Sequence, residues 1–520
     1  MHKLMLRLIF IGIVFHNYDA LSAGKAEHVV VVVWDGMRPD FISKEHTPAL
    51  YQLAQDGVIF QNHHAVYPSS TEVNGAAIAT GAYPQNSGII ANREYRPAID
   101  SQRVIDTQDN DAIHKGDKIS HGHYLLRPTI TETLQAAGLN TAIAGTKPVV
   151  LLHGRRERPE DYRAGTLLFE GKTLPSSLQT ALNDSLGEFP AAEDSKSLLP
   201  NEQRDEWTTR ALIGPLWSNG VPAFSLLWLS EPDYSQHPSA PGAQKSLAAL
   251  ESCDRKLAEV LAELERRKLR DKTDVFVVSD HGFSTIERGV DICAALQKAG
   301  FPAQRSFTNP PQSGQILVNG LGGSVSFYVI GHDSSTVRRL VEFLQKQDFT
   351  GVILTRERAP GTFTLDDVKL RSPEAPDVVL SFRWSADKSK LGAPGLLTVD
   401  GALSSKGGAH TSLSQFDMHN TLVGAGPDLK RGFTDSLPTG NTDLAPTVLW
   451  LLGVKSKEPM DGRVLSEALM VEATEVGKPV IRRIETKCVG ENSTWSQYLQ
   501  ISSVNDTVYF DEGDGAAQAK

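Results

Sequence analysis

The chain has 520 residues, a formal net charge of −10 at pH 7, and a composition of 40% hydrophobic and 22% charged residues. This is the composition of a soluble globular protein, which argues against a disordered chain or a repeat architecture. The sequence has no dense cluster of Lys and Arg, so we expect no surface that docks a nucleic acid. A small phosphorylated substrate remains compatible with the negative charge, because bound divalent metals dominate the local field in such sites.

Residues 1–23 have the pattern of a signal peptide. Lys3 and Arg7 precede an apolar run at residues 8–15, and small residues follow at 20–23. The apolar run is far shorter than the roughly 20 residues that cross a bilayer. We therefore expect an exported protein, periplasmic or extracellular, without a transmembrane span. The alternative is a buried N-terminal helix or strand.

Three apolar runs along the chain each lead into an acidic residue. The runs are residues 28–34, 224–229 and 274–278, and the acidic residues that follow them are Asp35, Asp233 and Asp280. Continuous apolar runs favour strands buried on both faces, as in a parallel sheet. Residues 246–269 lie between two of the runs and have apolar residues at helical spacing. The pattern predicts an α/β fold, with a doubly wound, mainly parallel sheet that has helices on both faces.

The rest of the chain predicts an insertion and a C-terminal extension. Residues 285–400 contain short strand patterns at 325–330 and 378–382 and an amphipathic helix at 336–347. We interpret them as an α+β cap inserted into a catalytic domain that consists of residues 27–284 and 401–470. Residues 471–520 predict terminal strands, followed by a polar tail after Glu512 that we expect to be disordered.

Histidines accompany the acidic residues and suggest a metal centre. Asp233 and His237 are four residues apart between two prolines, which predicts that a loop brings them together. Asp280 is followed directly by His281, and His410 stands in a glycine-rich stretch. Taken singly, an acidic residue after a strand is more often a helix cap, and a single histidine is more often structural. Together with Asp35 they predict a metal centre, and carboxylate with imidazole suits zinc.

Residues 69–71 offer hydroxyl groups for a nucleophile. A hydroxyl at the start of a helix lies beside free backbone N–H groups, which also attract a phosphate. The alternative is a plain cap, in which Thr71 or a neighbouring serine caps a helix over residues 73–80. Spacing alone favours the cap.

A series of short motifs extends this pattern over most of the chain. In order they are Trp34-Asp35-Gly36-Met37-Arg38, Thr47-Pro48, Thr71, Asn74, Thr80-Gly81, Tyr83-Pro84, Asn92, Asp233, His237, Asp280-His281-Gly282, His410, Gly424-Ala425-Gly426-Pro427 and Met460-Asp461-Gly462-Arg463. This series resembles the nucleotide pyrophosphatase/phosphodiesterase branch of the alkaline phosphatase superfamily over about residues 28–470. The resemblance is specific for the superfamily and for its metal site.

The resemblance implies two Zn²⁺ per chain and a threonine nucleophile. One zinc site would consist of Asp233, His237 and His410, and the other of Asp35, Asp280, His281 and the Thr71 hydroxyl. Asn92 and the Glu72 backbone N–H would bind a non-bridging phosphate oxygen. Thr71 would attack phosphorus, and water would release the phospho-threonine intermediate. The implied activity is a phosphodiesterase or nucleotide pyrophosphatase.

Residue 72 departs from the family pattern. The diesterase branch typically has an aromatic residue after the nucleophile, where this chain has Glu72. An acidic side chain offers no stacking face for a base. Glu72 would instead favour a cationic or hydroxylated leaving group, or it would simply point to solvent.

Other activities remain as alternatives. A phosphomonoesterase would use the same ligands and nucleophile, with added donors around the phosphate. A sulfatase would need a Cys or Ser in a Cys/Ser-x-Pro-x-Arg context, which the sequence lacks. A non-catalytic binding protein on the same fold would usually have lost a ligand or the nucleophile, and none of the matched positions is missing.

Several further residues have two interpretations. Lys147 and Arg155-Arg156 are either contacts to a second phosphate or, as we favour, solvated loop charges. Trp228 is either part of a pocket or a core residue. His63-His64 matches no motif and is assigned to packing. Three cysteines allow one disulfide at most.

Overall fold

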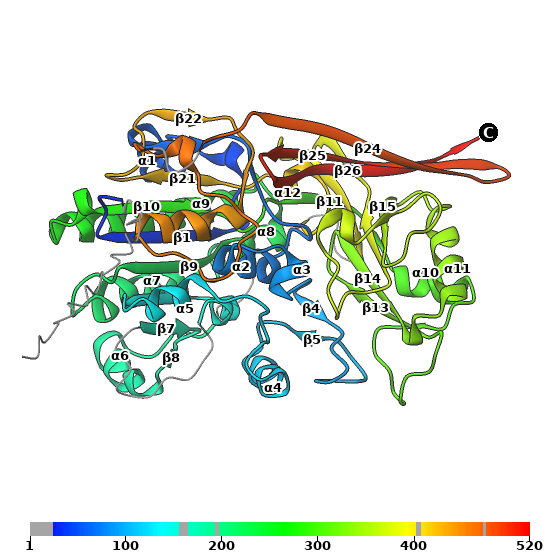
Figure 1. The fold of residues 1–520 in the computed structure, drawn as a ribbon, viewed down its shortest axis with the longest axis horizontal. Helices are drawn as coiled ribbons and strands as arrows, with labels where there is room; N and C mark the ends of the chain where they lie inside the picture. The colour runs from blue at the N-terminus through cyan, green and yellow to red at the C-terminus, as the bar shows by residue number, and fades with distance from the viewer. Residues whose placement is uncertain (1–23, 155–164, 193–196, 402–406, 472–474) are drawn as a thin grey trace, which may run out of the picture.

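The computed structural model describes residues 24–154, 165–192, 197–401, 407–471 and 475–520. The predicted signal peptide at 1–23 and the pair Arg155-Arg156 lie outside these residues. The largest sheet has nine strands in the order β22-β2-β21-β10-β1-β9-β6-β7-β8 (Figure 1). Most neighbours in it are parallel, and helices lie on both faces, which confirms the predicted α/β class.

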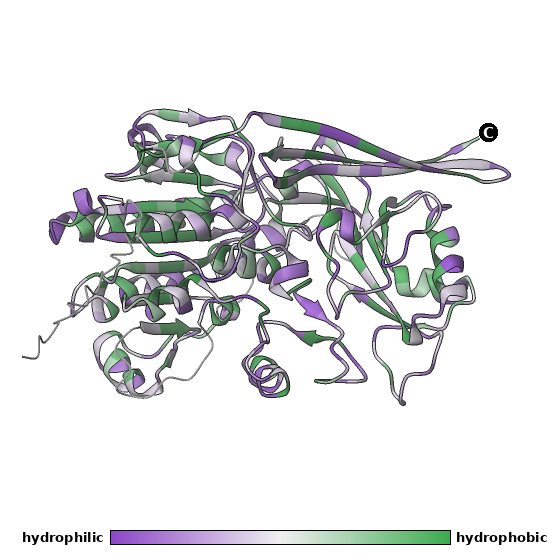
Figure 2. Ribbon diagram, viewed as in Figure 1, coloured by the Kyte–Doolittle hydropathy of each residue, from purple (hydrophilic) through white to green (hydrophobic). Residues whose placement is uncertain are grey.

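Strand β1 (His28–Asp35) lies at the middle of this sheet, between β9 (Phe224–Pro232) and β10 (Thr273–Val278), and is parallel to both. Its side chains alternate between two cores. Val29, Val31 and Val33 pack with the helices of one face, which are α2 (Thr71–Thr80), α5 (Ile130–Ala136) and α13 (Leu444–Leu451). The residues between them pack with the other face, on α1 (Pro48–Asp56), α7 (Glu202–Ala211) and α9 (Gln244–Arg266). Burial on both faces explains why the sequence of β1 is continuously apolar (Figure 2).

Shorter strands complete the large sheet. They are β2 (Val58–Phe60), β6 (Thr141–Gly145), β7 (Gly165–Phe169), β8 (Lys172–Leu174), β21 (Leu422–Ala425) and β22 (Phe433–Asp435). The antiparallel neighbours are β21, which pairs with β10 and β2, and β8, which pairs with β7. Smaller elements outside the large sheet are β3 (His63–His64), α3 (Pro84–Ser87), β4 (Arg93–Glu94), β5 (Ile105–Asp106), α4 (Asn110–Ser120), α6 (Gln179–Leu186) and β23 (Thr439–Gly440).

The segment predicted as a cap has its own sheet and its own core. Its sheet has the order β12-β13-β14-β17-β15-β16, with α10 (Ile292–Lys298) and α11 (Ser334–Leu344) beside it. The strands are β12 (Ala303–Gln304), β13 (Ile316–Gly320), β14 (Ser324–Val329), β15 (Thr350–Thr355), β16 (Phe363–Thr364) and β17 (Val378–Phe382). A four-stranded sheet links it to the part of the chain that holds the large sheet. Its strands are β11 (Ser284–Val290), β18 (Trp384–Lys388), β19 (Pro394–Asp400) and β20 (Gly408–Ala409). The domain boundaries at 285 and 400 stay a prediction.

The C-terminal strands form an antiparallel sheet of β24 (Pro479–Val489), β25 (Ser493–Val504) and β26 (Thr507–Ala519), which extends from the large sheet over the cap (Figure 1). The prediction of a disordered tail after Glu512 is wrong, because β26 pairs with β25 as far as Ala519. The ladder is made of backbone hydrogen bonds, so it leaves little trace in a sequence of small and polar residues. A Cβ on Gly515 would lie 2.3 Å from the Gly351 carbonyl oxygen, so this strand needs a glycine there.

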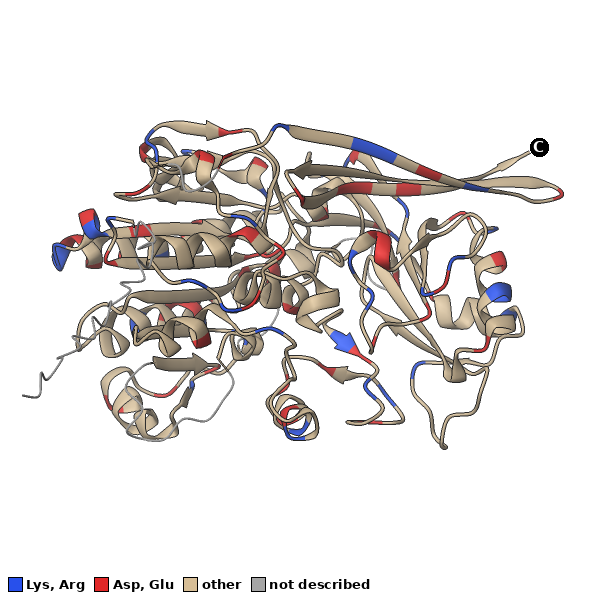
Figure 3. Cartoon of the chain, in the orientation of Figure 1, with Lys and Arg blue, Asp and Glu red and all other residues tan. Residues whose placement is uncertain are grey.

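Three global features bear on the predictions made from composition. Acidic and basic residues are interspersed along the ribbon (Figure 3). In the part of the chain that is described, no helix is both long and apolar enough to cross a membrane. All three cysteines are free thiols.

A buried carboxyl pair at the start of β10 couples stability to pH. Asp274 is fully buried, and its Oδ1 accepts a hydrogen bond from the Asp428 backbone N–H at 3.2 Å. Burial and the charge of Asp428 raise the pKa of Asp274 to about 8. The folded-state pKa therefore exceeds the unfolded value of about 3.9, and the unfolded chain releases this proton first. The stability that Asp274 contributes is therefore fully present below its unfolded pKa and is lost as the pH rises towards 8.

We expect Asp274→Asn to flatten this pH dependence. In the wild type, the free energy of unfolding should fall by at most about 1.4 kcal/mol per pH unit between pH 5 and 8 because of this group. Urea unfolding at several pH values measures the slope, and Asp271→Asn, at an exposed neighbouring position, serves as the control. Equal slopes for wild type and Asp274→Asn would contradict the assignment.

Candidate metal centre and nucleophile

Three acidic side chains meet at one edge of the large sheet. Asp35 is the last residue of β1, Asp233 is the first residue of α8 (Asp233–Ser239) directly after β9, and Asp280 follows β10 by two residues. All three are less than 5% exposed. Because β1, β9 and β10 are adjacent and parallel, their carboxyl ends lie side by side, which is where ligands bind in such sheets.

Three histidines point their Nε2 atoms at these carboxylates. His237 and His410 lie with Nε2 at 3.3 and 3.6 Å from Asp233 Oδ1. His281 Nε2 lies 3.4 Å from Asp280 Oδ2 and 3.7 Å from Asp35 Oδ1. The six side chains named by the sequence as zinc ligands are thus brought together.

The second ring nitrogen of each histidine bonds to a backbone carbonyl oxygen. The Nδ1 of His281, His410 and His237 lies 2.9, 2.8 and 3.2 Å from the carbonyl oxygens of Gly282, Ser69 and Gly408 respectively. A carbonyl oxygen only accepts, so in the neutral ring Nδ1 carries the proton and Nε2 presents a lone pair. This is how metal-binding histidines are usually held.

The carboxylates have oxygen atoms without partners. Asp35 Oδ1, Asp233 Oδ1 and Asp280 Oδ2 are buried and make no hydrogen bond to the described residues. Leaving an ionised oxygen in this state costs several kcal/mol unless a cation balances it. Two overlapping groups of ligand atoms lie within 4.8 Å: Asp233 with His237 and His410, and Asp35 with Asp233 and His281. Carboxylate and imidazole donors in this arrangement fit adjacent metal ions of the zinc type.

The prediction that a loop carries Asp233 and His237 is wrong. They lie one turn apart on the short helix α8. Pro232 precedes this helix, where no intrahelical N–H bond is needed, and Pro238 falls in its last turn, where it removes only one bond. Prolines at the two ends therefore bound the helix and do not prevent it.

Thr71 is the first residue of α2 and is 4% exposed. Its Oγ1 lies 3.3 Å from His281 Nε2. The cap interpretation allowed Thr71 or a neighbouring serine, and the neighbouring Ser70 occupies the N-cap position, but no side chain makes a cap hydrogen bond to this helix. The Thr71 hydroxyl therefore faces the metal-ligand cluster at the helix N-terminus.

Two asparagines fix the start of α2. Asn74 Oδ1 accepts from the Val66 backbone N–H at 2.7 Å, and its amide nitrogen donates to the Ser70 carbonyl oxygen at 3.0 Å. Asn92 Oδ1 accepts from the Glu72 backbone N–H at 3.2 Å. Asn92 therefore lies beside Thr71, and its amide N–H₂ is available to the same site.

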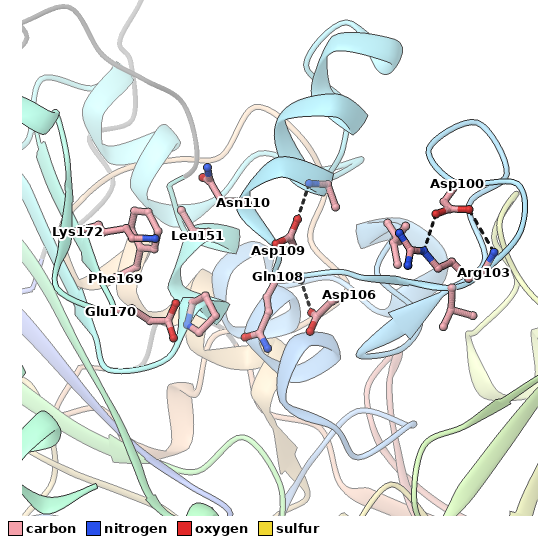
Figure 4. Close-up of a pocket in the computed structure, with 14 residues that line it drawn as sticks. Asp100, Arg103, Asp106, Gln108, Asp109, Asn110, Leu151, Phe169, Glu170 and Lys172 are labelled. Atoms are coloured by element: carbon pink, nitrogen blue, oxygen red, sulfur yellow. Dashed lines mark hydrogen bonds and ion pairs between the residues drawn. The ribbon is translucent and has the colours of Figure 1, made fainter. Parts of the chain in front are cut away.

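Glu72 does not point to solvent, which corrects one of its two interpretations. It is 2% exposed, and its Oε2 makes no hydrogen bond to the described residues. Burial and the charge of Asp106 raise the pKa of Glu72 to about 8. Asp106 lines a polar cavity of about 460 Å³, together with Gln108, Asp109 and Glu170 (Figure 4).

Lys147 is part of the site and not a solvated loop charge. Its Nζ lies 2.9 Å from Asp35 Oδ2 and 2.7 Å from Asp233 Oδ2. Burial alone would lower the pKa of Lys147, but Asp233 and Asp35 raise it well above its usual value. Trp228 is fully buried and donates from Nε1 to Asp35 Oδ2 at 2.8 Å. Both roles were missed in the sequence, although Lys147 follows β6 at the same edge of the sheet.

The pKa values of the two carboxylates bonded to Lys147, Asp233 and Asp35, are shifted in opposite directions. Burial would raise the pKa of Asp233, yet Lys147 and His237 hold it well below its usual value. Burial and the charge of Asp280 raise the pKa of Asp35 well above its usual value and outweigh Lys147. A cation at the orphaned oxygen of Asp35 would relieve this cost.

Comparisons with known proteins identify the family of this chain. The family model of type I phosphodiesterase / nucleotide pyrophosphatase matches residues 29–388. The bis(5'-adenosyl)-triphosphatase ENPP4 of Homo sapiens is 22% identical over 283 residues, which cover 54% of this chain and 53% of that protein. Venom phosphodiesterase 2 of Crotalus adamanteus is 25% identical over 282 residues, which cover 53% of this chain and 27% of that protein. The chain spans about half the length of ENPP4, and less of the venom enzyme.

Solved structures show the same fold. Murine ectonucleotide pyrophosphatase / phosphodiesterase 5 superposes with a TM-score of 0.60 at 17% sequence identity, covering 85% of this chain and all of that one. The human protein of the same name gives a TM-score of 0.57. The family match extends over more than half of the 520 residues. The chain therefore belongs to the type I phosphodiesterase / nucleotide pyrophosphatase family.

Proposed function

We propose that this protein is a two-zinc phosphodiesterase or nucleotide pyrophosphatase that acts through Thr71. The observation that carries the proposal is the Thr71 hydroxyl at a helix N-terminus, 3.3 Å from His281 Nε2. His281 belongs to the cluster of three histidines and three carboxylates with orphaned oxygens. Relatives support the substrate class. ENPP4 is named as a bis(5'-adenosyl)-triphosphatase, and an inactive threonine-to-alanine variant of murine ENPP5 was solved in complex with AMP.

The ligands divide into two sets in this proposal. Asp233, His237 and His410 hold one zinc, and Asp35, Asp280, His281 and the Thr71 hydroxyl hold the other. When bound, the two ions lower the pKa of the Thr71 hydroxyl and neutralise charge on the transferring phosphoryl group.

The protein's own groups orient the reaction. The Asn92 amide lies beside the N-terminus of α2, where its N–H₂ would donate to a non-bridging phosphate oxygen. The Glu72 backbone N–H would join it by exchanging its bond to Asn92 Oδ1 for one to the phosphate. Thr71 attacks phosphorus, the alcohol or phosphate leaving group departs, and water hydrolyses the phospho-threonine intermediate. In this proposal the substrate is a small phosphorylated molecule, and the reaction takes place outside the cytoplasm, as the sequence pattern of residues 1–23 predicts.

An assay of two model esters tests the proposal. Purified protein with zinc is given bis-p-nitrophenyl phosphate and p-nitrophenyl phosphate in parallel, each with and without a chelator. We expect turnover that is lost with the chelator and that favours the diester. If neither ester is cleaved by protein that holds both zinc ions, the catalytic proposal fails in favour of a binding role.

Lys147 is the observation that favours the phosphomonoesterase alternative. A monoester carries one more negative charge than a diester, and an ammonium group between Asp35 and Asp233 supplies a donor that the two metals do not. Preference for the monoester in the same assay would select this alternative. It would leave the metal ligands and Thr71 in their proposed roles.

The burial of Glu72 predicts a preference among leaving groups. Above pH 8 its carboxyl is charged. Glu72 directly follows the nucleophile in the chain and interacts electrostatically with Asp106, which lines the polar cavity. At pH 9 we expect a choline diester to be cleaved about tenfold better than its uncharged 3,3-dimethylbutyl isostere, which corresponds to about 1.4 kcal/mol. Glu72→Gln should remove this difference in kcat/KM. An equal preference in wild type and variant would exclude Glu72 from leaving-group selection.

A further inference from the structure

A second cluster of histidine and carboxylate lies outside the proposed catalytic centre. It joins three segments that are far apart in the sequence: His64 in β3, His419 directly after α12 (Gln415–Met418), and Asp511 in β26. One ligand atom from each residue lies within 4.8 Å of the others. His64 and Asp511 are buried, and His419 is partly exposed. The assignment of His64 to packing alone therefore leaves its polar contacts unexplained.

The hydrogen bonds of His64 require a positive charge. Its Nδ1 lies 2.9 Å from the Thr439 carbonyl oxygen, and its Nε2 lies 2.9 Å from Asp511 Oδ1. Both partners only accept hydrogen bonds, whereas a neutral imidazole has one N–H. Either the buried ring is an imidazolium, or Nδ1 keeps its proton and Nε2 shares a cation with Asp511.

The neighbouring contacts are those of a metal site. Asp511 Oδ2 accepts from the Ser502 hydroxyl at 2.9 Å, which fixes the carboxylate and leaves Oδ1 directed at His64. The His419 ring lies 4.4 Å from the His64 ring, centroid to centroid, and its nitrogens make no hydrogen bond to a described residue. Each of the two buried donors thus has a second partner that orients it, as is usual for metal ligands. The third, His419, is partly exposed and has no hydrogen-bond partner for its ring among the described residues.

We propose that His64, His419 and Asp511 bind a third divalent metal ion, which connects strand β26 to strand β3 and to the residue after α12. Two imidazoles and one carboxylate select a first-row transition metal, with zinc the best match, over calcium or magnesium, which prefer all-oxygen sites. Three protein ligands leave one position for water on the exposed side of His419. None of the three residues belongs to the two proposed catalytic zinc sites.

The site would act on the stability of the junction between β3 and β26. Tyr509, two residues before Asp511, stacks on His64 with ring centroids 5.6 Å apart. In addition, His63 Nε2 lies 3.0 Å from Asn441 Oδ1, and the Asn441 amide donates to the Asp280 carbonyl oxygen at 2.7 Å. A metal at His64 would therefore stabilise strand β3, which connects through Asn441 to the proposed zinc ligand Asp280.

His419→Ala is the decisive variant, because it removes a ligand without touching the His64–Asp511 hydrogen bond. Zinc per chain is measured by elemental analysis after dialysis against a weak chelator, together with Tm. We expect His419→Ala and Asp511→Asn each to lose one zinc equivalent and to have a lower Tm than the wild type. His419→Gln is a second variant that keeps a polar side chain at the partly exposed position. His46→Ala, whose ring pairs with exposed Glu251 at 2.9 Å, is the matched control.

The difference in zinc between wild type and His419→Ala is the quantity that decides. If it is zero for both His419 variants, the cluster is an imidazolium–carboxylate pair and the proposal is wrong. A similar loss in His46→Ala would show only adventitious surface binding and would also overturn it. Failure of the proposed catalytic zinc sites would lower the zinc content of every variant equally, and the difference at His419 would persist.

Discussion

Thr71→Ala should abolish turnover, with a loss of at least about 10⁴-fold in kcat, while the zinc content stays close to that of the wild type. The substitution removes the proposed nucleophile, but six proposed metal ligands remain: Asp35, Asp233, His237, Asp280, His281 and His410. Among the described residues the Thr71 hydroxyl makes a hydrogen bond only with His281, so its loss should change the fold little. The measurement pairs steady-state kinetics on the diester with elemental analysis of the same preparation.

Thr71→Ser is the matched control, because it keeps a hydroxyl at the N-terminus of α2. We expect this variant to retain a substantial part of the activity. Near-normal turnover in Thr71→Ala would refute the nucleophile assignment. A joint loss of activity and zinc would instead show that the hydroxyl is needed to hold a metal. Whether Thr71 is also the nucleophile would then be tested by trapping the phospho-threonine intermediate in the wild type.

The fold was visible in the sequence where burial leaves a pattern. Strand β1 is buried on both faces at the centre of a parallel sheet, so its run of valines is continuous. Helix α9 is amphipathic, and its predicted range differs from the observed Gln244–Arg266 by only a few residues. The acidic residues at strand ends could be grouped because parallel neighbours place their carboxyl ends at one edge.

What was missed depends on contacts that no local pattern encodes. Lys147 reaches Asp35 and Asp233 only because β6 is next to β9, and strand order does not follow from the sequence of any one strand. Glu72 is buried because every residue of α2 is buried. The helix therefore has no exposed polar face, and its sequence does not show which side chains face solvent. Strand β26 is held by a backbone ladder to β25, which small and polar side chains do not reveal.

The metal ligands of the candidate site could thus be predicted from the sequence, but the charged and polar contacts between them could not. The resemblance named Asp233 and Asp35 as ligands of different ions. The structure adds that one ammonium group, Lys147, joins them, and that Trp228 donates to Asp35 from within the sheet. These contacts set the charge that a substrate phosphate meets, and they are the features that bear on monoester or diester preference.

His410→Ala should remove one zinc equivalent per chain and lower turnover by more than about 100-fold. His410 is 6% exposed, its Nδ1 is fixed by the Ser69 carbonyl oxygen, and its Nε2 faces Asp233 Oδ1. Loss of this ring leaves Asp233 and His237 as a two-ligand site, which holds zinc weakly. Ser69 lies two residues before the nucleophile, so the variant should also loosen the approach to Thr71.

The grouping of ligands gives this prediction its control. His237→Ala should lose the same zinc equivalent as His410→Ala, and the double variant should lose no more than either single one, because both rings serve one ion. His281→Ala should lose the other equivalent, and together with His410→Ala it should lose both. Zinc per chain is read by elemental analysis, with His332→Ala, an exposed histidine paired with Asp377, as the reference. Unchanged zinc in His410→Ala, or additive losses in the His237 and His410 double variant, would show that the two rings do not share an ion.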